Sequence, residues 1–78
     1  MDKQTMDFFV NDSPRQGLAG LSLEGLLLAE GLGRGEPPQI PAGVAVALNQ
    51  VVIPRPQWAL TPVASGDRID IFSVIAGG

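Results

Sequence analysis

The chain contains no cysteine, no histidine and no tyrosine, and its one lysine is at position 3. Without cysteine it can form no disulfide, and without cysteine and histidine it lacks the usual ligands of zinc. The same absences remove the commonest nucleophiles and general bases of enzymes. The eight carboxylates are scattered, and none of them has the spacing of a calcium-binding loop. We therefore expect no metal site and no catalytic residue in this chain.

Charge is also scarce. Charged residues make up 17% of the 78 residues, and the net charge is −3. This balance excludes both the basic surface of a nucleic-acid-binding protein and a polybasic patch for anionic lipid. No apolar run approaches the ~20 residues of a membrane-spanning helix, and the first residues do not resemble a signal peptide. We expect a small cytoplasmic domain with no nucleic-acid or membrane partner.

Hydrophobic residues nevertheless account for 45% of the chain, enough for a folded domain. Alternating or β-branched runs separated by turn residues predict strands at 6–10, 15–18, 44–48, 51–53 and 68–75. The turns are expected at 11–14, 49–50 and 66–67, a long loop at 33–43, and a single helical turn at 56–60. Residues 1–5 are polar and without periodicity, so we expect a disordered extension before a domain at 6–78.

One helix is expected between the second and third strands. Ser22 is a suitable N-cap, and the leucines at 23, 26 and 27 fall on one helical face. The leucines at 28 and 32 widen this face, and the glycines at 33 and 35 are expected to end the helix. Strands around one helix in so short a chain indicate an α+β domain. Its helix would pack across a mixed sheet of four to five strands.

Several segments together resemble a known family. Residues 49–58 (NQVVIPRPQW) are similar to the N-x-x-x-V/I-P-R-x-x-W segment of the sulfur carrier proteins of thiamin biosynthesis, the ThiS family. Residues 66–69 (GDRI) match that family's turn into its last strand, and residues 74–78 (VIAGG) match its C-terminus. The resemblance covers about residues 6–78 and implies the β-grasp, or ubiquitin-like, fold. The chain departs from the family at Glu30, where leucine is usual, and in a longer 33–43 loop.

The resemblance also implies a chemistry for the terminal glycine. An activating enzyme of the ubiquitin-activating type, using ATP and magnesium, would adenylate the α-carboxyl of Gly78. Sulfur would then replace AMP to give a thiocarboxylate, and a thiazole synthase would take that sulfur for the thiazole ring of thiamin. A flexible tail of Ile75, Ala76, Gly77 and Gly78 would enter the partner's active site. The chain itself would bind no cofactor and would be a co-substrate, not an enzyme.

Four further residues are candidates for contact with partners. Phe72 and Val74 are expected to point away from the core on the last strand, where Phe72 is either part of an apolar surface patch for a partner or covered by a loop. Arg55 stands between two prolines and is expected to project toward an acidic partner or into solvent. Trp58 is expected either to contact a partner or to cover the core.

Two other functions fit part of the pattern. The small subunit of molybdopterin synthase shares the fold, the terminal Gly-Gly and the thiocarboxylate. It usually has two prolines before its last residues, where this chain has Ser73 and Val74. A ubiquitin-like protein modifier is the third candidate, but Lys3 would be its only lysine for chain building, and the V/I-P-R-x-x-W segment is not expected in it.

Overall fold

A computed structural model describes residues 4–73 and shows one mixed sheet with its helices on one side. The elements, in chain order, are β1 (Thr5–Val10), β2 (Ser13–Leu18), α1 (Leu23–Ala29), β3 (Val44–Leu48), β4 (Val51–Val52), the 3₁₀ helix η1 (Arg55–Leu60) and β5 (Arg68–Ser73). The strand order in the sheet is β2-β1-β5-β3-β4. Only β1 and β5 pair in parallel among the described strands; the other neighbours are antiparallel. The predicted α+β architecture is confirmed.

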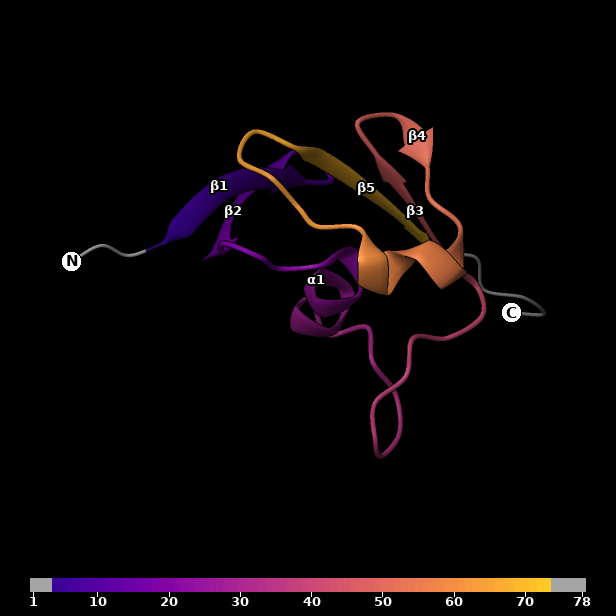
Figure 1. The fold of residues 1–78 in the computed structure, drawn as a ribbon. Helices are drawn as coiled ribbons and strands as arrows, with labels where there is room; N and C mark the ends of the chain where they lie inside the picture. The colour runs from indigo at the N-terminus through magenta and orange to yellow at the C-terminus, as the bar shows by residue number, and fades with distance from the viewer. Residues whose placement is uncertain (1–3, 74–78) are drawn as a thin grey trace.

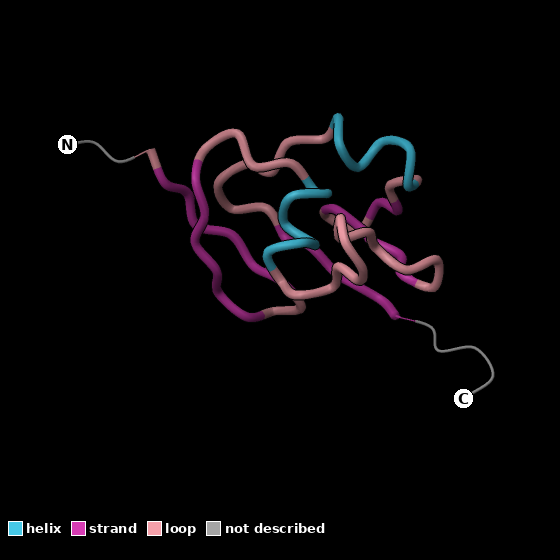
Figure 2. The backbone as a smooth tube through the Cα atoms, turned by 90° about the horizontal axis from the view of Figure 1, so that it is seen from below, coloured by secondary structure: helices cyan, strands magenta, loops and turns pink. Residues whose placement is uncertain are grey.

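The core lies between the sheet and the two helical elements. In Figure 1, α1 and η1 lie beneath the strands, and Figure 2 views the molecule from that helical side. Alternate residues of β1 point inward, so that Met6, Phe8 and Val10 are buried. The leucine face of α1 packs against them, together with Ile69 of β5. One face of the sheet is therefore covered, while the other carries no helix among residues 4–73.

The first hairpin turns more tightly than the sequence indicated. Asn11 and Asp12 both have positive φ, at 50° and 71°, and this pair alone makes the turn. β2 therefore begins at Ser13 and not near Arg15. The other end of the hairpin corrects the expected 1–5 extension: Thr5 pairs with Leu18. The Gln4 carbonyl also accepts a hydrogen bond of 2.7 Å from the Ala19 amide, so residues 4 and 5 belong to the fold. Residues 1–3 lie outside the described residues.

The helix starts where the sequence predicted and ends earlier. The Ser22 hydroxyl accepts a 3.0 Å hydrogen bond from the Gly25 amide, which is the expected N-cap contact. At the other end Gly31 has a φ of +85°, a conformation that side chains disfavour. The amides of Gly31 and Leu32 donate to the carbonyls of Leu28 and Leu27, which completes a Schellman motif. The prediction that the helix ends at the glycines 33 and 35 is therefore wrong, because Gly31 already ends it.

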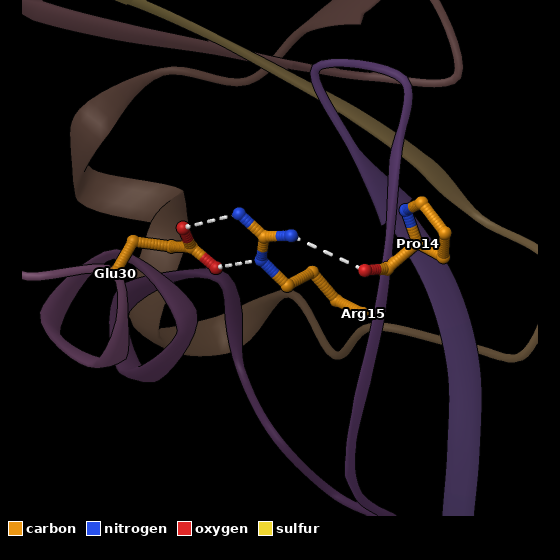
Figure 3. Close-up of polar contacts among 3 residues, drawn as sticks. All are labelled: Pro14, Arg15 and Glu30. Atoms are coloured by element: carbon orange, nitrogen blue, oxygen red, sulfur yellow. Dashed lines mark hydrogen bonds and ion pairs between the residues drawn. The ribbon is translucent and has the colours of Figure 1, made fainter.

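Glu30, the departure from the family pattern, has a structural partner. Its carboxylate accepts hydrogen bonds from Nε and Nη2 of Arg15 at 2.9 Å and 3.4 Å, as Figure 3 shows. Nη1 of the same arginine donates to the Pro14 carbonyl at 3.2 Å. The pair connects the end of α1 to the edge strand β2. The charge of Glu30 is thus paired with an arginine of β2.

The second half of the chain follows the predicted pattern closely. Asn49 and Gln50 have positive φ values of 51° and 73° and form the two-residue turn between β3 and β4. The 33–43 loop is not featureless, because the backbone groups of Arg34 and Gln39 exchange hydrogen bonds of 2.8 Å and 2.9 Å. It extends from the helical side of the domain in Figure 1. Within residues 4–73, no helix is long and apolar enough to cross a membrane.

Candidate functional site

The central strand β5 positions the start of the C-terminal segment. It lies between β1 and β3, and its last residue, Ser73, is opposite Val44, the first residue of β3. The predicted site residues Val74, Ile75, Ala76, Gly77 and Gly78 all lie outside the described residues. What the structure describes is therefore the base from which the segment 74–78 continues and the surface beside that base.

The uncovered face of the sheet carries an apolar patch next to this base. Phe72 is 53% exposed and lies opposite Ala45 of β3, which is also exposed. Ala47, two residues further along β3, is only 6% exposed, but it lies opposite Val52 of β4, which is 67% exposed. Residues opposite each other in an antiparallel pair share a face, so these side chains form one surface. We call the three exposed residues, Phe72, Ala45 and Val52, the outer patch.

The exposure of Phe72 confirms the expectation from the strand pattern. Ile69 is buried and Ile71 is half-buried on the opposite, core-facing side. Asp70 lies on the same face as Phe72 and opposite Ala47, so it borders the outer patch with a carboxylate. Sequence reasoning missed the contributions of β3 and β4. The alternation of large and small residues in VAVAL was the available signal, since it places alanines on the uncovered face.

Arg55 is exposed, as predicted, but its guanidinium also makes contacts within the domain. Its guanidinium turns back and donates to the carbonyls of Ile40 and Pro41, at 2.9 Å and 2.5 Å. The same group stacks on the Trp58 ring, 4.6 Å from the centroid. The sequence did not indicate these contacts, because the acceptors come from a loop 14 and 15 residues away. Arg55 joins η1 to the end of the 33–43 loop.

Trp58 covers the core and is not an exposed contact residue. It is 3% exposed and belongs to the buried cluster with Ile40 and Val63. Its indole N–H donates to the Ile53 carbonyl at 2.8 Å, so its polar atom is satisfied as burial requires. Of the two expectations for Trp58, the structure supports the one in which it covers the core. Its selection as a candidate for contact with partners is therefore corrected.

Two surface hollows border α1. One, of about 540 Å³, is lined by Phe8, Leu21 and Leu26 and by the Arg15–Glu30 pair. The other, of about 290 Å³, lies between α1, the 33–43 loop and η1 and is bordered by Arg55 and Trp58. Across residues 4–73, no three acidic side chains lie close enough together to hold a metal ion. Neither hollow adjoins the outer patch residues, so we place the candidate site on the uncovered face and at the end of β5.

The chain is similar to known proteins in sequence and in fold. The ThiS family model matches residues 8–78, the greater part of the chain. The sulfur carrier protein ThiS of Escherichia coli (strain K12) is 42% identical over 73 residues, which cover 94% of this chain and all of that protein. A crystal structure of the thiamine biosynthesis protein ThiS from Geobacter metallireducens superposes with a TM-score of 0.71 at 29% identity, over 94% of this chain and all of that one.

The predicted β-grasp fold is confirmed by the sheet order and by this structural match. Of the motifs that carried the resemblance, residues 49–58 span the turn into β4, β4 itself and the start of η1, residues 66–69 lead into β5, and residues 74–78 lie outside the described residues. The chain belongs to the ThiS family.

Proposed function

We propose that this chain is a sulfur carrier in thiamin biosynthesis and that the α-carboxylate of Gly78 is the group that carries the sulfur. The single observation that supports this most strongly is the 42% identity to a protein named sulfur carrier protein ThiS, over its full length. The family match also extends to residue 78 and so includes the terminal Gly-Gly. The family match favours a thiamin sulfur carrier over the small subunit of molybdopterin synthase and over a ubiquitin-like protein modifier.

The chemistry needs activation because a carboxylate is a poor electrophile at neutral pH. A carboxylate oxygen of Gly78 attacks the α-phosphorus of ATP, pyrophosphate leaves, and an acyl adenylate forms. A hydrosulfide-level sulfur nucleophile then attacks the carbonyl carbon and AMP leaves, so that sulfur replaces one oxygen. The resulting thiocarboxylate gives up its sulfur during formation of the thiazole ring. ATP and magnesium belong to the activating partner, and the catalytic groups are those of the partners.

The geometry of the domain suits a carrier whose body stays outside its partner's active site. Five residues follow Ser73, and a fully extended segment of that length spans at most roughly 17 Å. Glycine at both final positions lets the backbone enter a narrow channel, since it has no Cβ. The outer patch beside the end of β5 offers the activating enzyme and the thiazole synthase an apolar surface near the segment they must receive.

Intact-mass measurement tests the proposal. The chain is incubated with the activating enzyme, ATP and a sulfide source, and the full-length protein should gain about 16 Da, the difference between sulfur and oxygen, through covalent activation at Gly78. A chain lacking Gly78 should gain nothing, because its carboxylate lies about 3.3–3.6 Å short of the reacting position. A chain with one alanine added after Gly78 should also gain nothing.

A chain lacking residues 1–3 is the matched truncation control, because it keeps Gly78 and every described contact. It should gain the same mass as the full-length protein. If the chain without Gly78 gains this mass as well, the sulfur resides elsewhere and the proposal is wrong.

A further inference from the structure

The strand β2 forms one edge of the sheet and pairs only with β1. The two-residue turn at Asn11 and Asp12 makes Val10 and Ser13 the first hydrogen-bonded pair of the hairpin. Hydrogen-bonded and non-hydrogen-bonded pairs alternate along an antiparallel ladder, so every second residue of β2 turns its N–H and C=O away from β1. The residues that face outward in this way are Pro14, Gln16 and Leu18.

Three outward-facing main-chain groups of β2 have no partner among residues 4–73. Pro14 has no N–H, and its carbonyl accepts a hydrogen bond of 3.2 Å from Nη1 of Arg15, as Figure 3 shows. The Leu18 carbonyl accepts a hydrogen bond of 3.2 Å from the Leu21 amide. The N–H and C=O of Gln16 and the N–H of Leu18 are left unpaired in this part of the chain. Because unpaired groups on a sheet edge are a template for another extended chain, this edge can form three hydrogen bonds with an added strand.

A hollow lies beside the same edge, on the helical side of the sheet. Gly17 is opposite the buried Met6, which places residue 17 on that side. Gly17 lines the hollow of about 540 Å³, together with Phe8, Leu21 and Leu26. Residues opposite each other on paired strands share a face, so an added strand places one side chain beside Gly17, on the helical side. That side chain meets apolar walls at a position where β2 itself has no side chain.

We propose that the edge of β2 binds an extended segment of a partner protein, as an added strand that places an aliphatic side chain in the hollow. The hydrogen bonds to Gln16 and Leu18 supply affinity, and the hollow selects the aliphatic residue. The outer patch lies on β5, β3 and β4, and β4 is the opposite edge of the sheet. The proposed strand-binding edge is therefore separate from the outer patch, and it does not depend on the proposed sulfur chemistry.

A second copy of this chain fits the edge less well than a foreign segment does. If two β2 strands paired antiparallel about Gln16, Pro14 of each copy would lie opposite Leu18 of the other. The Leu18 N–H would then face a carbonyl that Arg15 already binds, and Pro14 has no N–H to donate. Two copies therefore form two hydrogen bonds where a foreign strand forms three. The other edge strand, β4, has two residues and is followed closely by Pro54, so it offers a strand less.

Gln16→Pro is the test variant, and Gln16→Thr is its matched control. Proline removes the outward N–H at position 16, which the hairpin does not use, and edge strands accept proline at such positions. Threonine keeps this N–H. Both substitutions remove the hydrogen bond of 3.2 Å that the Gln16 side chain donates to Asp7. The two variants therefore differ in the main-chain donor that the proposal requires.

The measurement is an NMR titration of the full chain with a blocked peptide in which isoleucine and threonine alternate. This peptide should shift the amide signals of Gln16 and Leu18 and the methyl signals of Leu21 and Leu26. A control peptide of threonine alone keeps the β-branched side chains but lacks the aliphatic ones, so its Kd should be about tenfold higher. For the isoleucine peptide, Gln16→Pro should raise Kd about tenfold, because one peptide carbonyl loses its donor, while Gln16→Thr should stay within about twofold of the wild type.

Several results would overturn the proposal. Signals that shift only at Phe72 and Val52 would place the peptide on the outer patch, and the absence of any shift at millimolar peptide would show that the edge does not bind an extended segment. Equal Kd values for Gln16→Pro and Gln16→Thr would show that main-chain pairing is not used. If Gln16→Pro does not fold, the two peptides on the wild-type chain decide, and equal Kd values for them overturn the proposal.

The oligomeric state tests the remaining occupant, a second copy. Sedimentation equilibrium of the wild-type chain without peptide should give a monomer. A dimer that is lost in Gln16→Pro and kept in Gln16→Thr would make a second copy the occupant of the edge and overturn the proposal. None of these measurements involves Gly78, so their failure would leave the proposed sulfur transfer standing.

Discussion

Replacing Phe72 by aspartate should weaken binding to the activating enzyme while the domain stays folded. Phe72 is the largest side chain of the outer patch, and 53% of it is exposed. It lies opposite Ala45 and shares its face with Asp70. A second carboxylate two residues from Asp70 would place two like charges on the surface that we propose as the docking face.

The magnitude follows from the area that docking can still cover. A phenylalanine buries roughly 150–250 Å² when fully enclosed, so its exposed half offers roughly 100 Å² to a partner. At about 25 cal/mol per Å² this area contributes roughly 2.5 kcal/mol to the free energy of binding. Its loss corresponds to a roughly 60-fold increase in Kd, since 1.4 kcal/mol is a factor of about ten.

The cost to folding should be smaller than the stability of the domain. The buried part of Phe72 and the poor strand propensity of aspartate together suggest a loss of roughly 1–2 kcal/mol in the free energy of unfolding. A domain with about 5 kcal/mol of stability then retains about 3 kcal/mol, and under about 1% of it is unfolded. Circular dichroism melting on the same sample would show a single transition at a modestly lower temperature.

Isothermal titration with the activating enzyme measures the Kd, and Leu60→Asp is the matched control. Leu60 is 76% exposed, but it lies on η1, on the side of the sheet that α1 also occupies (Figure 1). Its replacement should leave Kd within about twofold, as for a surface position away from the interface. The reasoning is refuted if Phe72→Asp binds like the wild type while Leu60→Asp binds weakly, because docking would then use the helical side.

Two further predictions concern the fold itself. Ser22→Ala removes the N-cap hydrogen bond to Gly25 and should lower the free energy of unfolding, measured by urea denaturation, by about 1 kcal/mol. Ser22→Asp should recover most of this loss. An unchanged urea midpoint in Ser22→Ala would show that packing alone fixes the helix start. Removing residues 1–5 should lower the melting temperature, because the hydrogen bond to the Gln4 carbonyl and the pairing of Thr5 are lost. Removing residues 1–3 should leave the melting temperature unchanged. Equal melting temperatures of the two truncations would show that the Gln4 and Thr5 contacts contribute nothing to stability.

Local chemistry explains why much of this fold was predictable from the sequence. The turn at Asn49–Gln50 needs two residues that tolerate positive φ, and asparagine is among the few that do. The helix start at Ser22 depends on one hydroxyl and one amide three residues later. The inward alternation of β1 and the outward position of Phe72 follow from the period of two in a strand. Each of these features is decided within a few residues of the chain.

The family motifs predicted more of the fold than the local sequence pattern alone. The segment at 49–58, the turn at 66–69 and the terminal glycines pointed to a ThiS-like β-grasp domain, which the sheet order and the structural match bear out. No local rule gives the strand order, because pairing of β1 with β5 joins residues about sixty positions apart. The order was implied only by the resemblance.

What the sequence could not decide were contacts between distant segments. Glu30 reads as an odd charge on an apolar helix until β2 brings Arg15 to 2.9 Å from it. Arg55, flanked by prolines, is exposed as the sequence indicated, but two carbonyls of the 33–43 loop and the Trp58 ring also hold its guanidinium. These contacts form only once the 33–43 loop has returned to η1. The sequence by itself therefore determined the turn at Asn49–Gln50, the helix start and the outward face of β5, while tertiary packing decided which partners Glu30 and Arg55 have within the domain.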